Sequence, residues 1–457
     1  MTPSLRSVCI PLPRDCLDPY SLFAPLLDDR QPFLLDGERF ALCGSRPIAE
    51  LVLDDCADPI AELERFVTAH RPAGSTGRSE AGIPAARIVG YLSYDVGATL
   101  ERIPRHAADD LGMPLLAFAA YSASATIDLE RGTLTCFAER EVEARTLAHR
   151  LIAGATQRPF QPDRERARIG ALVPAISRER YLDSVCRALE WIRDGDIYQV
   201  NLSQRFSAPL GAQFDPYHRY VIGRRAHPTA FGAYLPWGGH TILSGSPERF
   251  ARFDALSRRI ETMPIKGTLR RRDREDDPRG RDQEPSADEA QRIDTFLRDA
   301  KERAEHVMIV DLERNDLGRV CRYGSVRVSD FCRLERYSTL YHLVSTVEGT
   351  VRPSVGVGAI LRATFPGGSI TGAPKIRAMQ IIEALEPIRR GLYTGSIGYF
   401  DWDLGFDFNI AIRTAIIHRG ALYLQVGGGI VADSLPEREL AETLTKAESW
   451  RCLPGCD

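Results

Sequence analysis

The sequence lacks the features that mark membrane, secreted and nucleic-acid-binding proteins. None of its apolar runs approaches the ~18 residues that a membrane-spanning helix needs. The amino-terminal segment has no basic stretch followed by an apolar stretch, which a secretion signal would have. The 59 basic and 62 acidic residues are closely mixed, and the formal net charge is -3. No basic surface for nucleic acid or for an anionic membrane is therefore predicted.

Paired cysteine motifs are also absent. The ten cysteines are scattered along the chain, and none of them forms a Cys-x-x-Cys pair. The closest two, Cys452 and Cys456, stand at the carboxyl end. This pattern favours reduced thiols in a cytoplasmic protein over disulfides or a zinc site.

The phosphate-binding motifs of nucleotide-binding proteins are missing as well. The glycine-rich stretch "TFPGGSITGAPKIRAM" leads into a predicted helix with Ile376, Met379 and Ile382 facing inward. Because Gly372 is followed by Ala-Pro-Lys, the motif Gly-x-x-x-x-Gly-Lys-Ser/Thr is not formed. The N-terminus of a helix still favours an anion, but nucleotide binding is only weakly supported.

What is present indicates a large α+β protein. Of the 457 residues, 44% are hydrophobic and 26% are charged, as in soluble globular proteins. A polar stretch at 154–181 predicts a connection between an N-terminal region (1–160) and a larger C-terminal region (178–450). Strand-like runs such as "QVNLSQRF", "DFNIAIRTAIIH" and "ALYLQVGGGIV" arrive in groups, and residues 286–320 predict a long charged helix with further helix or turn behind it. Because no sustained strand–helix–strand alternation occurs, we predict large, mainly antiparallel sheets.

Two pairs of glutamates recur at helical spacing. Glu302 and Glu305 are three residues apart, as are Glu439 and Glu442, and Pro436 can begin the second helix. Residues three apart project from one face of a helix. Two such faces meeting would form an oxygen-rich site that suits Mg²⁺. Either pair alone is also typical of a solvated helix surface, so both interpretations stay open.

A lysine and an arginine occupy unusual positions. Lys266 lies in an apolar, glycine-bounded turn within "TMPIKGTLRRR", where burial would favour a neutral, nucleophilic amine, although most lysines are exposed. Arg413 has the small neighbours Ala411 and Ala415 on its predicted strand. It could receive a carboxylate through two hydrogen bonds or form a structural ion pair. The glycine run 427–429 indicates a bulge or a ligand close to the main chain.

Strings distributed from about residue 180 to residue 450 resemble the chorismate-utilising enzymes. In family order they are "GDIYQVNLSQRF", "LSGSPERF", "PIKGT", "AEHVMIVDLERNDLGRV", "FPGGSITGAPKIRAM", "YTGSIGYFD", "NIAIRTA" and "GGGIVADSLPERELAETLTKA". The resemblance implies the family's α+β fold, in which large antiparallel sheets pack face to face with helices outside. It also implies that residues 1–160 are similar to the N-terminal region of anthranilate synthase components.

The same resemblance implies roles for the residues of the site. The four glutamates would bind Mg²⁺, Lys266 would be the nucleophile, and Glu248 in "GSPERF" would be the general acid. His342 would be an active-site histidine. The carboxylate of the enolpyruvyl group would be held by Arg413, Tyr393 and the main chain near Gly429. The ring carboxylate would be held by Lys446 and Thr268.

Two positions imply which reaction the chain supports. Water-adding members of the family carry lysine where this chain has Gln199, so isochorismate and salicylate synthases are disfavoured. Anthranilate synthases typically carry alanine in place of Lys266, whereas "PIKGT" is similar to the corresponding string of aminodeoxychorismate synthases. This implies conversion of chorismate and ammonia to 4-amino-4-deoxychorismate, a precursor of 4-aminobenzoate and folate. Anthranilate synthesis and a non-catalytic chorismate-binding subunit are the alternatives.

The sequence shows no internal source of ammonia. No Gly-x-Cys-x-Gly segment of a glutaminase occurs, and Cys43 lies in "ALCGSRP" without the preceding glycine. The resemblance therefore implies a separate glutamine amidotransferase subunit, with free ammonia as a substitute. The family's inhibitor-binding segment often reads Leu-Leu-Glu-Ser, whereas residues 34–37 read Leu-Leu-Asp-Gly, which leaves tryptophan binding open.

Overall fold

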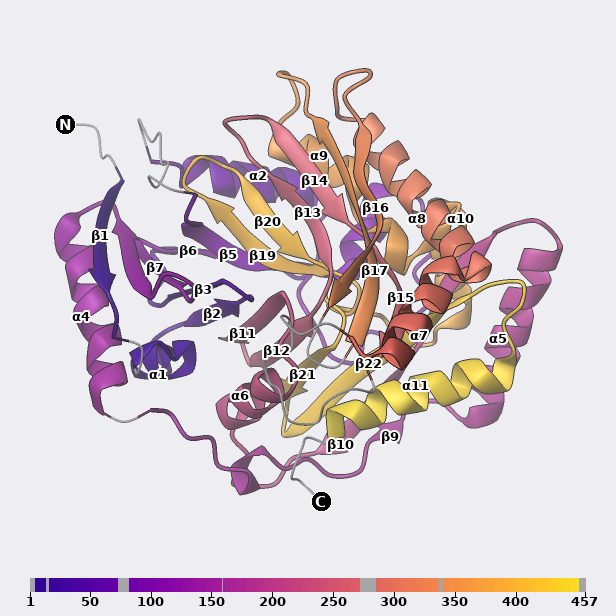
Figure 1. The fold of residues 1–457 in the computed structure, drawn as a ribbon, viewed down its shortest axis with the longest axis horizontal. Helices are drawn as coiled ribbons and strands as arrows, with labels where there is room; N and C mark the ends of the chain where they lie inside the picture. The colour runs from indigo at the N-terminus through magenta and orange to yellow at the C-terminus, as the bar shows by residue number, and fades with distance from the viewer. Residues whose placement is uncertain are drawn as a thin grey trace.

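Two large antiparallel sheets dominate the computed structural model (Figure 1). The structure describes residues 5–13, 16–72, 82–157, 159–271, 285–336 and 340–451. One sheet has twelve strands and the other has ten. Apolar side chains of both sheets form a shared core between them, and helices pack on the outer faces. The predicted α+β class with face-to-face antiparallel sheets is confirmed.

The twelve-stranded sheet contains, in spatial order, β1 (Arg6–Pro11), β8 (Thr133–Ala138), β7 (Ala123–Asp128), β3 (Phe40–Gly44), β2 (Phe33–Asp36), β11 (Phe231–Trp237), β12 (His240–Ser246), β21 (Thr414–His418), β22 (Ala421–Ile430), β10 (Gln199–Pro209) and β18 (Gly372–Ala373), with β9 (Val173–Pro174) beside β10. The ten-stranded sheet contains β15 (Ile265–Arg270), β17 (Leu340–Thr350), β14 (Arg259–Met263), β13 (Arg249–Phe253), β20 (Phe406–Asn409), β19 (Ser396–Asp401), β5 (Ala86–Leu92), β6 (Leu116–Ala120) and β4 (Ala49–Leu53), with β16 (Arg327–Arg336) beside β17. The helices are α1 (Pro19–Phe23), α2 (Pro59–Ala69), α3 (Gly97–Leu100), α4 (Glu141–Gln157), α5 (Arg178–Arg193), α6 (Pro216–Ala226), α7 (Ala287–Arg298), α8 (Ala300–Gly318), α9 (Val357–Thr364), α10 (Lys375–Leu385) and α11 (Pro436–Arg451).

Both sheets combine strands from the two regions of the sequence. In the larger sheet β2 pairs with β11, with Leu34 opposite Tyr234. In the smaller sheet β5 pairs with β19, with Gly90 opposite Gly398. The division near residues 160–178 therefore remains a prediction about sequence regions, which share their sheets in the fold.

The alternation of side chains along β5 shows how the layers are held together. Val89 and Tyr91 join the core between the two sheets, whereas Ile88 and Leu92 join the core beneath the outer helices. Successive residues of a strand point to opposite faces, so one strand serves both cores. β5 is buried along its whole length and is apolar except for Arg87, which donates to the carbonyl oxygen of Tyr121 and to Glu139.

The long helix predicted for residues 286–320 is in fact two helices, α7 and α8. The break occurs at Asp299, whose backbone is extended. The Asp299 side chain accepts a hydrogen bond from the backbone N–H of Glu302 at 3.0 Å, which caps the start of α8. An acidic residue followed by glutamate three positions later is a helix-start signal, and the continuous charge pattern concealed it.

The single strand predicted for "DFNIAIRTAIIH" is also two strands, and they belong to different sheets. β20 ends at Asn409 in the ten-stranded sheet, and β21 begins at Thr414 in the twelve-stranded sheet. The chain crosses between the sheets at residues 410–413, and Arg413 has a positive φ of 49°. Arg413 therefore lies at the crossing, not within a strand.

The prediction that Ile376 of α10 faces inward is wrong. Met379 and Ile382 are buried, but Ile376 is 44% exposed. At about 100° per residue, positions six apart lie about 240° apart around a helix, so Ile376 falls on the opposite side from the buried face.

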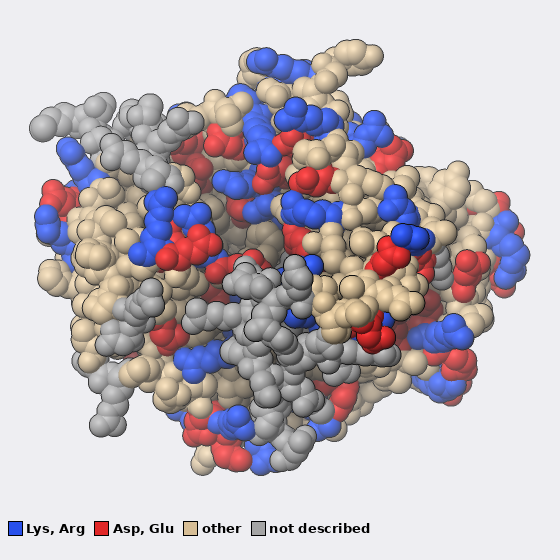
Figure 2. Space-filling model, viewed as in Figure 1, with Lys and Arg blue, Asp and Glu red and all other residues tan. Residues whose placement is uncertain are grey.

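Charges of both signs are interspersed over the face shown in Figure 2. Among the described residues, no helix combines the length and the apolar character needed to cross a membrane. The eight described cysteines are all free thiols, while Cys452 and Cys456 lie outside the described residues.

Candidate active site

The glycine run of β22 forms the base of the candidate site. In its pairing with β10, Gly429 lies opposite Asn201. A Cβ atom on Gly429 would lie 2.3 Å from Nε2 of Gln199 and 3.3 Å from Oε1 of Glu305. Gln199 Nε2 itself donates a hydrogen bond to Glu305 Oε1 at 3.1 Å. A residue with a side chain would therefore displace these groups, and glycine lets them approach the main chain.

Helix α11 brings the second pair of glutamates to the same strand. α11 packs against β22 and begins at Pro436, as predicted (Figure 1). A Cβ atom on Gly428 would lie 3.4 Å from Oε2 of Glu439 and 3.7 Å from Oε1 of Glu442. Glu305 of α8 and the two glutamates of α11 thus face neighbouring glycines of one strand, whereas Oε2 of Glu302 would lie 3.0 Å from a Cβ atom on Gly267 of β15.

The donor set of this cradle fits Mg²⁺, which prefers carboxylate oxygens and water. The candidate ligands are Glu302 and Glu305 from α8 with the pair from α11. In the described part of the chain, no group of three or more His, Cys, Asp or Glu side chains is close enough to hold a metal ion. Two of the carboxylates are paired with lysines instead: Glu305 with Lys266 at 2.8 Å, and Glu442 with Lys446 at 2.6 Å. The oxygen ligands of this site are therefore of the kind that Mg²⁺ prefers. In the conformation observed, two lysines neutralise the charge of two of these carboxylates.

Lys266 lies inside the site, on a bulged strand. The pairing of β15 with β17 shifts between Lys266 and Thr268, and Gly267 between them has a positive φ of 76°. A Cβ atom there would lie 2.9 Å from the ring of Phe296 on α7. The side chain of Lys266 is 17% exposed, and its amine donates to Glu305. The sequence predicted burial of the lysine but not this carboxylate partner.

Glu248 occupies the turn between β12 and β13 and is almost completely buried, at 4% exposure. The backbone N–H of Ile265, next to Lys266, points at its Oε1 at 3.5 Å. Burial raises the pKa of Glu248, and the charges of Lys266 and Arg413 act in the opposite direction. A carboxyl group that keeps its proton is suited to act as a general acid.

His342 is buried on β17 beside the bulge. Its Nδ1 lies 3.3 Å from the carbonyl oxygen of Gly267, which can only accept, so Nδ1 carries the proton. Desolvation, helped by the charge of Arg413, lowers the pKa of His342 to about 4. The histidine is therefore neutral near pH 7 and suits hydrogen bonding better than charge pairing.

Arg413 and Tyr393 are the two further side chains that the sequence assigned to one carboxylate of the substrate. The charge of Arg413 acts on both Glu248 and His342, which places the guanidinium near both. Tyr393 is buried, and a Cβ atom on Gly427 would lie 2.9 Å from its hydroxyl oxygen. The phenol thus reaches the same glycine run that the glutamates face.

Lys446 and Thr268 are the two residues that the sequence assigned to the ring carboxylate. Lys446 is on the exposed side of α11, and its amine donates to the carbonyl oxygen of Gly427 at 2.8 Å as well as pairing with Glu442. Thr268 pairs with His342 through the main chain of β15, and its side chain lies outside the described residues.

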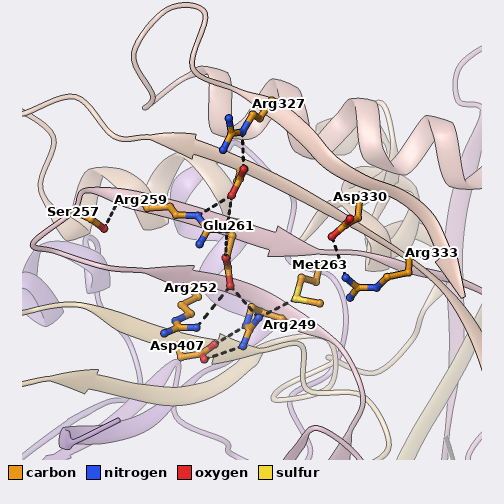
Figure 3. A network of polar contacts seen from close by, with 11 residues as sticks. Arg249, Arg252, Ser257, Arg259, Glu261, Met263, Arg327, Asp330, Arg333 and Asp407 are labelled. Carbon is orange, nitrogen blue, oxygen red and sulfur yellow. Dashed lines mark hydrogen bonds and ion pairs between the residues drawn. The ribbon is translucent and has the colours of Figure 1, made fainter. Parts of the chain in front are cut away.

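An ion network joins β13 to its neighbouring strands, beginning one residue after Glu248 (Figure 3). Arg249, the residue after Glu248, binds Asp407 at 3.0 Å and Glu261 at 3.1 Å. On β14, Glu261 of this network alternates with Thr262, which points to Glu313, so the network lies on the face of the sheet away from Glu313. The network ties β13 to both of its neighbours, β14 and β20.

Two buried polar residues in this region, Glu313 and Thr262, were not predicted as part of the site. Glu313 on α8 accepts a hydrogen bond from Oγ1 of Thr262 on β14 at 2.8 Å. The available signal was helical spacing, because Glu313 follows Glu305 by eight residues and so lies on a similar side of the helix.

The segment at residues 34–37 lies in a separate buried network. Asp36 accepts hydrogen bonds from Tyr20 at 2.8 Å and from Tyr220, and it pairs with Arg224 at 3.0 Å. All of these groups are buried. The structure thus supplies internal partners for the aspartate that replaces glutamate in the familiar motif.

Comparisons with known proteins agree with this geometry. The family described as chorismate binding enzyme matches residues 30–451. The chain is 42% identical over 367 residues to anthranilate synthase component 1 of Thermus thermophilus, covering 79% of this chain and 76% of that protein. It is 38% identical over 366 residues to aminodeoxychorismate synthase component 1 of Bacillus subtilis, covering 79% and 75%. The crystal structure of anthranilate synthase component I from Streptococcus pneumoniae superposes with a TM-score of 0.77 at 30% identity, covering 91% of this chain and 92% of that one.

The match extends through both sequence regions and includes every candidate site residue. Relatives of both reaction types align over most of the chain, so the likeness identifies the family and not one product. The chain belongs to the chorismate-binding enzymes, a family whose substrate is chorismate.

Proposed function

We propose that the chain is the synthase component of an aminodeoxychorismate synthase, which converts chorismate and ammonia to 4-amino-4-deoxychorismate for 4-aminobenzoate and folate synthesis. The observation that carries the proposal is Lys266. Its amine lies within the site, 2.8 Å from Glu305, and its neighbour Ile265 directs a backbone N–H toward Glu248. A lysine nucleophile and a protonated acid side by side suit a covalent route.

In the proposed first step, Lys266 leaves its ion pair, loses a proton and adds through its nitrogen to C2 of chorismate. The ring electrons shift, the C4–O bond breaks, and Glu248 gives its proton to the departing hydroxyl, which leaves as water. Ammonia then adds at C4, the electrons shift back, and the C2–N bond breaks. The new C4 amine gives a proton to Glu248, and the released Lys266 amine takes back from solvent the proton that it lost before the attack, so that both side chains are regenerated.

The charges of the substrate account for the other residues. Chorismate carries two carboxylates, and Arg413 offers a planar guanidinium for bidentate binding of one of them. Tyr393 and the main chain near Gly429 supply neutral donors beside it. Lys446 and Thr268 would hold the ring carboxylate, and neutral His342 would donate or accept a hydrogen bond.

We propose that Mg²⁺ completes this charge balance. Its ligands would be Glu302, Glu305, Glu439 and Glu442; the last three face the glycine run of β22, whereas Glu302 lies against Gly267. Bound there, the ion would supply positive charge to a carboxylate of the substrate.

Ammonia would come from a glutamine amidotransferase subunit, because the sequence contains no glutaminase nucleophile segment. We expect a heterodimer, and free ammonia should replace the partner in solution. The free thiols support a reducing compartment such as the cytoplasm.

The rival function is anthranilate synthesis, which the 42% identity to the Thermus thermophilus relative favours. That reaction adds ammonia directly at C2 and needs no lysine nucleophile. Lys266 is the feature that argues against it. A non-catalytic binding subunit would have no use for the buried acid of Glu248.

A product assay separates these functions. Purified protein is incubated with chorismate, Mg²⁺ and ammonium, and fluorescence is recorded before and after addition of an aminodeoxychorismate lyase. We expect no fluorescent anthranilate at first, and 4-aminobenzoate only once the lyase is present. Anthranilate without the lyase would establish the rival reaction, and no product in either arm would support a binding subunit.

A further inference from the structure

A buried carboxyl group lies behind the strand that carries Lys266. Glu313, on the inward side of α8, is 6% exposed, and Thr262 on β14 is 5% exposed. Oγ1 of Thr262 donates to Oε2 of Glu313 at 2.8 Å. A hydrogen bond between two fully buried groups is costly to leave half-made, so this contact constrains both elements.

The contact holds one end of a short segment whose other end is the proposed nucleophile. Four residues after Thr262, the amine of Lys266 donates to Glu305, which is also on α8. Between them, the carbonyl oxygen of Pro264 accepts from the backbone N–H of Ser345 at 3.2 Å. Helix α8 therefore contacts both ends of the bend between β14 and β15, through Glu313 and Glu305.

The same bend reaches Glu248. The backbone N–H of Ile265 points at Oε1 of Glu248 at 3.5 Å, so any shift of the bend changes the position of the acid relative to Lys266. The proposed reaction needs the lysine nitrogen and the acid proton on the same substrate at once. A displacement of about 1 Å in such a site can cost about 100-fold in rate.

The charged groups around Glu313 favour its neutral form. Burial raises the pKa of Glu313 well above its ordinary value, the hydrogen bond from Thr262 acts in the opposite direction, and the charges of Glu248 and Asp316 raise it further. The nearby cation, Lys375, lies 2.6 Å from Asp316 and is engaged there. A neutral Glu313 can accept the hydrogen bond from Thr262 whether Glu248 is protonated or ionised.

We propose that Glu313 is a positioning residue for catalysis, which anchors Thr262 and thereby fixes the bend that presents Lys266 and orients Glu248. It would act through the strand and would not touch the substrate. The inference rests on the proposed function, because it assumes that Lys266 attacks and Glu248 protonates.

The test compares three variants with a control on the same helix. Glu313→Gln keeps a neutral acceptor for Thr262 and should retain kcat within about twofold. Glu313→Ala and Thr262→Val each remove the hydrogen bond, and each should lower kcat and the rate of Lys266 adduct formation by about tenfold, with KM for chorismate unchanged. Asp311→Asn, at an exposed position of α8, should match the wild type.

The outcomes separate positioning from stability. Wild-type kcat and adduct rate in both Glu313→Ala and Thr262→Val, with only a lower Tm, would overturn the inference. So would a loss in Glu313→Gln as large as that in Glu313→Ala.

A second measurement does not depend on turnover. Infrared difference spectra at neutral pH should show a protonated carboxyl band that Glu313→Gln loses and Asp311→Asn keeps. Absence of that band from the wild type would overturn the neutral state of Glu313. A wild type that consumes no chorismate, with the band present, would instead contradict the proposed function.

Discussion

The amine of Lys266 lies 2.8 Å from Oε1 of Glu305, so the proposed nucleophile and a proposed metal ligand form one ion pair in the free protein. Mg²⁺ and the ammonium would compete for the same carboxylate. Release of the lysine for attack is therefore expected to accompany metal binding. This relationship gives the glutamate a part in both the charge balance and the availability of the nucleophile.

Glu305→Gln and Glu442→Gln should each abolish turnover while the protein stays folded. Each change removes a charged oxygen from the metal cradle and leaves the side-chain volume unchanged. The measurements are chorismate consumption and the circular dichroism spectrum. Glu437→Gln on the exposed side of α11 is the matched control and should stay active. Equal activity in excess EDTA and in Mg²⁺ would remove the metal from this account.

Arg413→Lys should weaken the use of chorismate without unfolding the protein. Lysine keeps the charge but loses the planar fork that binds a carboxylate through two hydrogen bonds. Loss of one charge-assisted hydrogen bond, about 1.5–3 kcal/mol, corresponds to roughly 10–150-fold in kcat/KM. The positive φ of Arg413 is kept in this variant, so backbone strain is not a confounding change. Steady-state kinetics equal to those of the wild type would indicate a structural role.

Asp36→Asn should be strongly destabilising. The change leaves the buried guanidinium of Arg224 without its counter-charge, which typically costs about 3–5 kcal/mol. Chemical denaturation measures the loss in free energy of unfolding. The comparison is Glu437→Gln, whose partner Arg178 is exposed and whose loss should cost less than about 1 kcal/mol. Similar effects of the two changes would show that the Asp36 network contributes no more than a surface pair.

Asp401 should make the protein less stable as pH rises from about 4 to about 6. Burial raises its pKa to about 6, above the ordinary value of 3.8, so the folded state binds more protons than the unfolded state in this window. The contribution of Asp401 to stability is therefore greatest below the window, and up to about 3 kcal/mol of that contribution is lost above it. Asp401→Asn should remove this contribution to the slope, because asparagine does not titrate in this range. The local structure should be kept, because the amide oxygen still accepts from the N–H groups of Asp403 and Gly405.

Denaturation midpoints at several pH values measure the slope. Asp55→Asn, at an exposed position, should leave it unchanged. Asp95, whose pKa burial also raises to about 6, should supply a remaining slope in Asp401→Asn. An unaltered slope in Asp401→Asn would contradict the assignment.

The sequence predicted the features that depend on local pattern. Alternation and helical spacing identified strands such as β10 and helices such as α11, because burial of one face leaves a periodic trace. The break at Asp299 was missed because charged residues continued on both sides of it. The crossing at 410–413 was missed because a strand pattern does not record that its two halves join different sheets.

The site shows the same division between local and distant information. The glutamate pairs and Lys266 were noticed from spacing and neighbours. Their meeting depends on contacts between residues far apart, such as Lys266 with Glu305 and Glu439 with Gly428. Glu313 was not selected, because its helical spacing from Glu305 is shared by other charged residues of α8 and does not by itself indicate burial.

A covalent bond between Lys266 and the substrate would be detected by intact-protein mass spectrometry. Wild type and Lys266→Ala are incubated with chorismate and Mg²⁺ in the absence of ammonia, with Glu437→Gln as a control. The account predicts an adduct on the wild type and the control that is missing from Lys266→Ala, which should also lose most aminodeoxychorismate formation. The absence of any adduct on the wild type together with full activity in Lys266→Ala would contradict it.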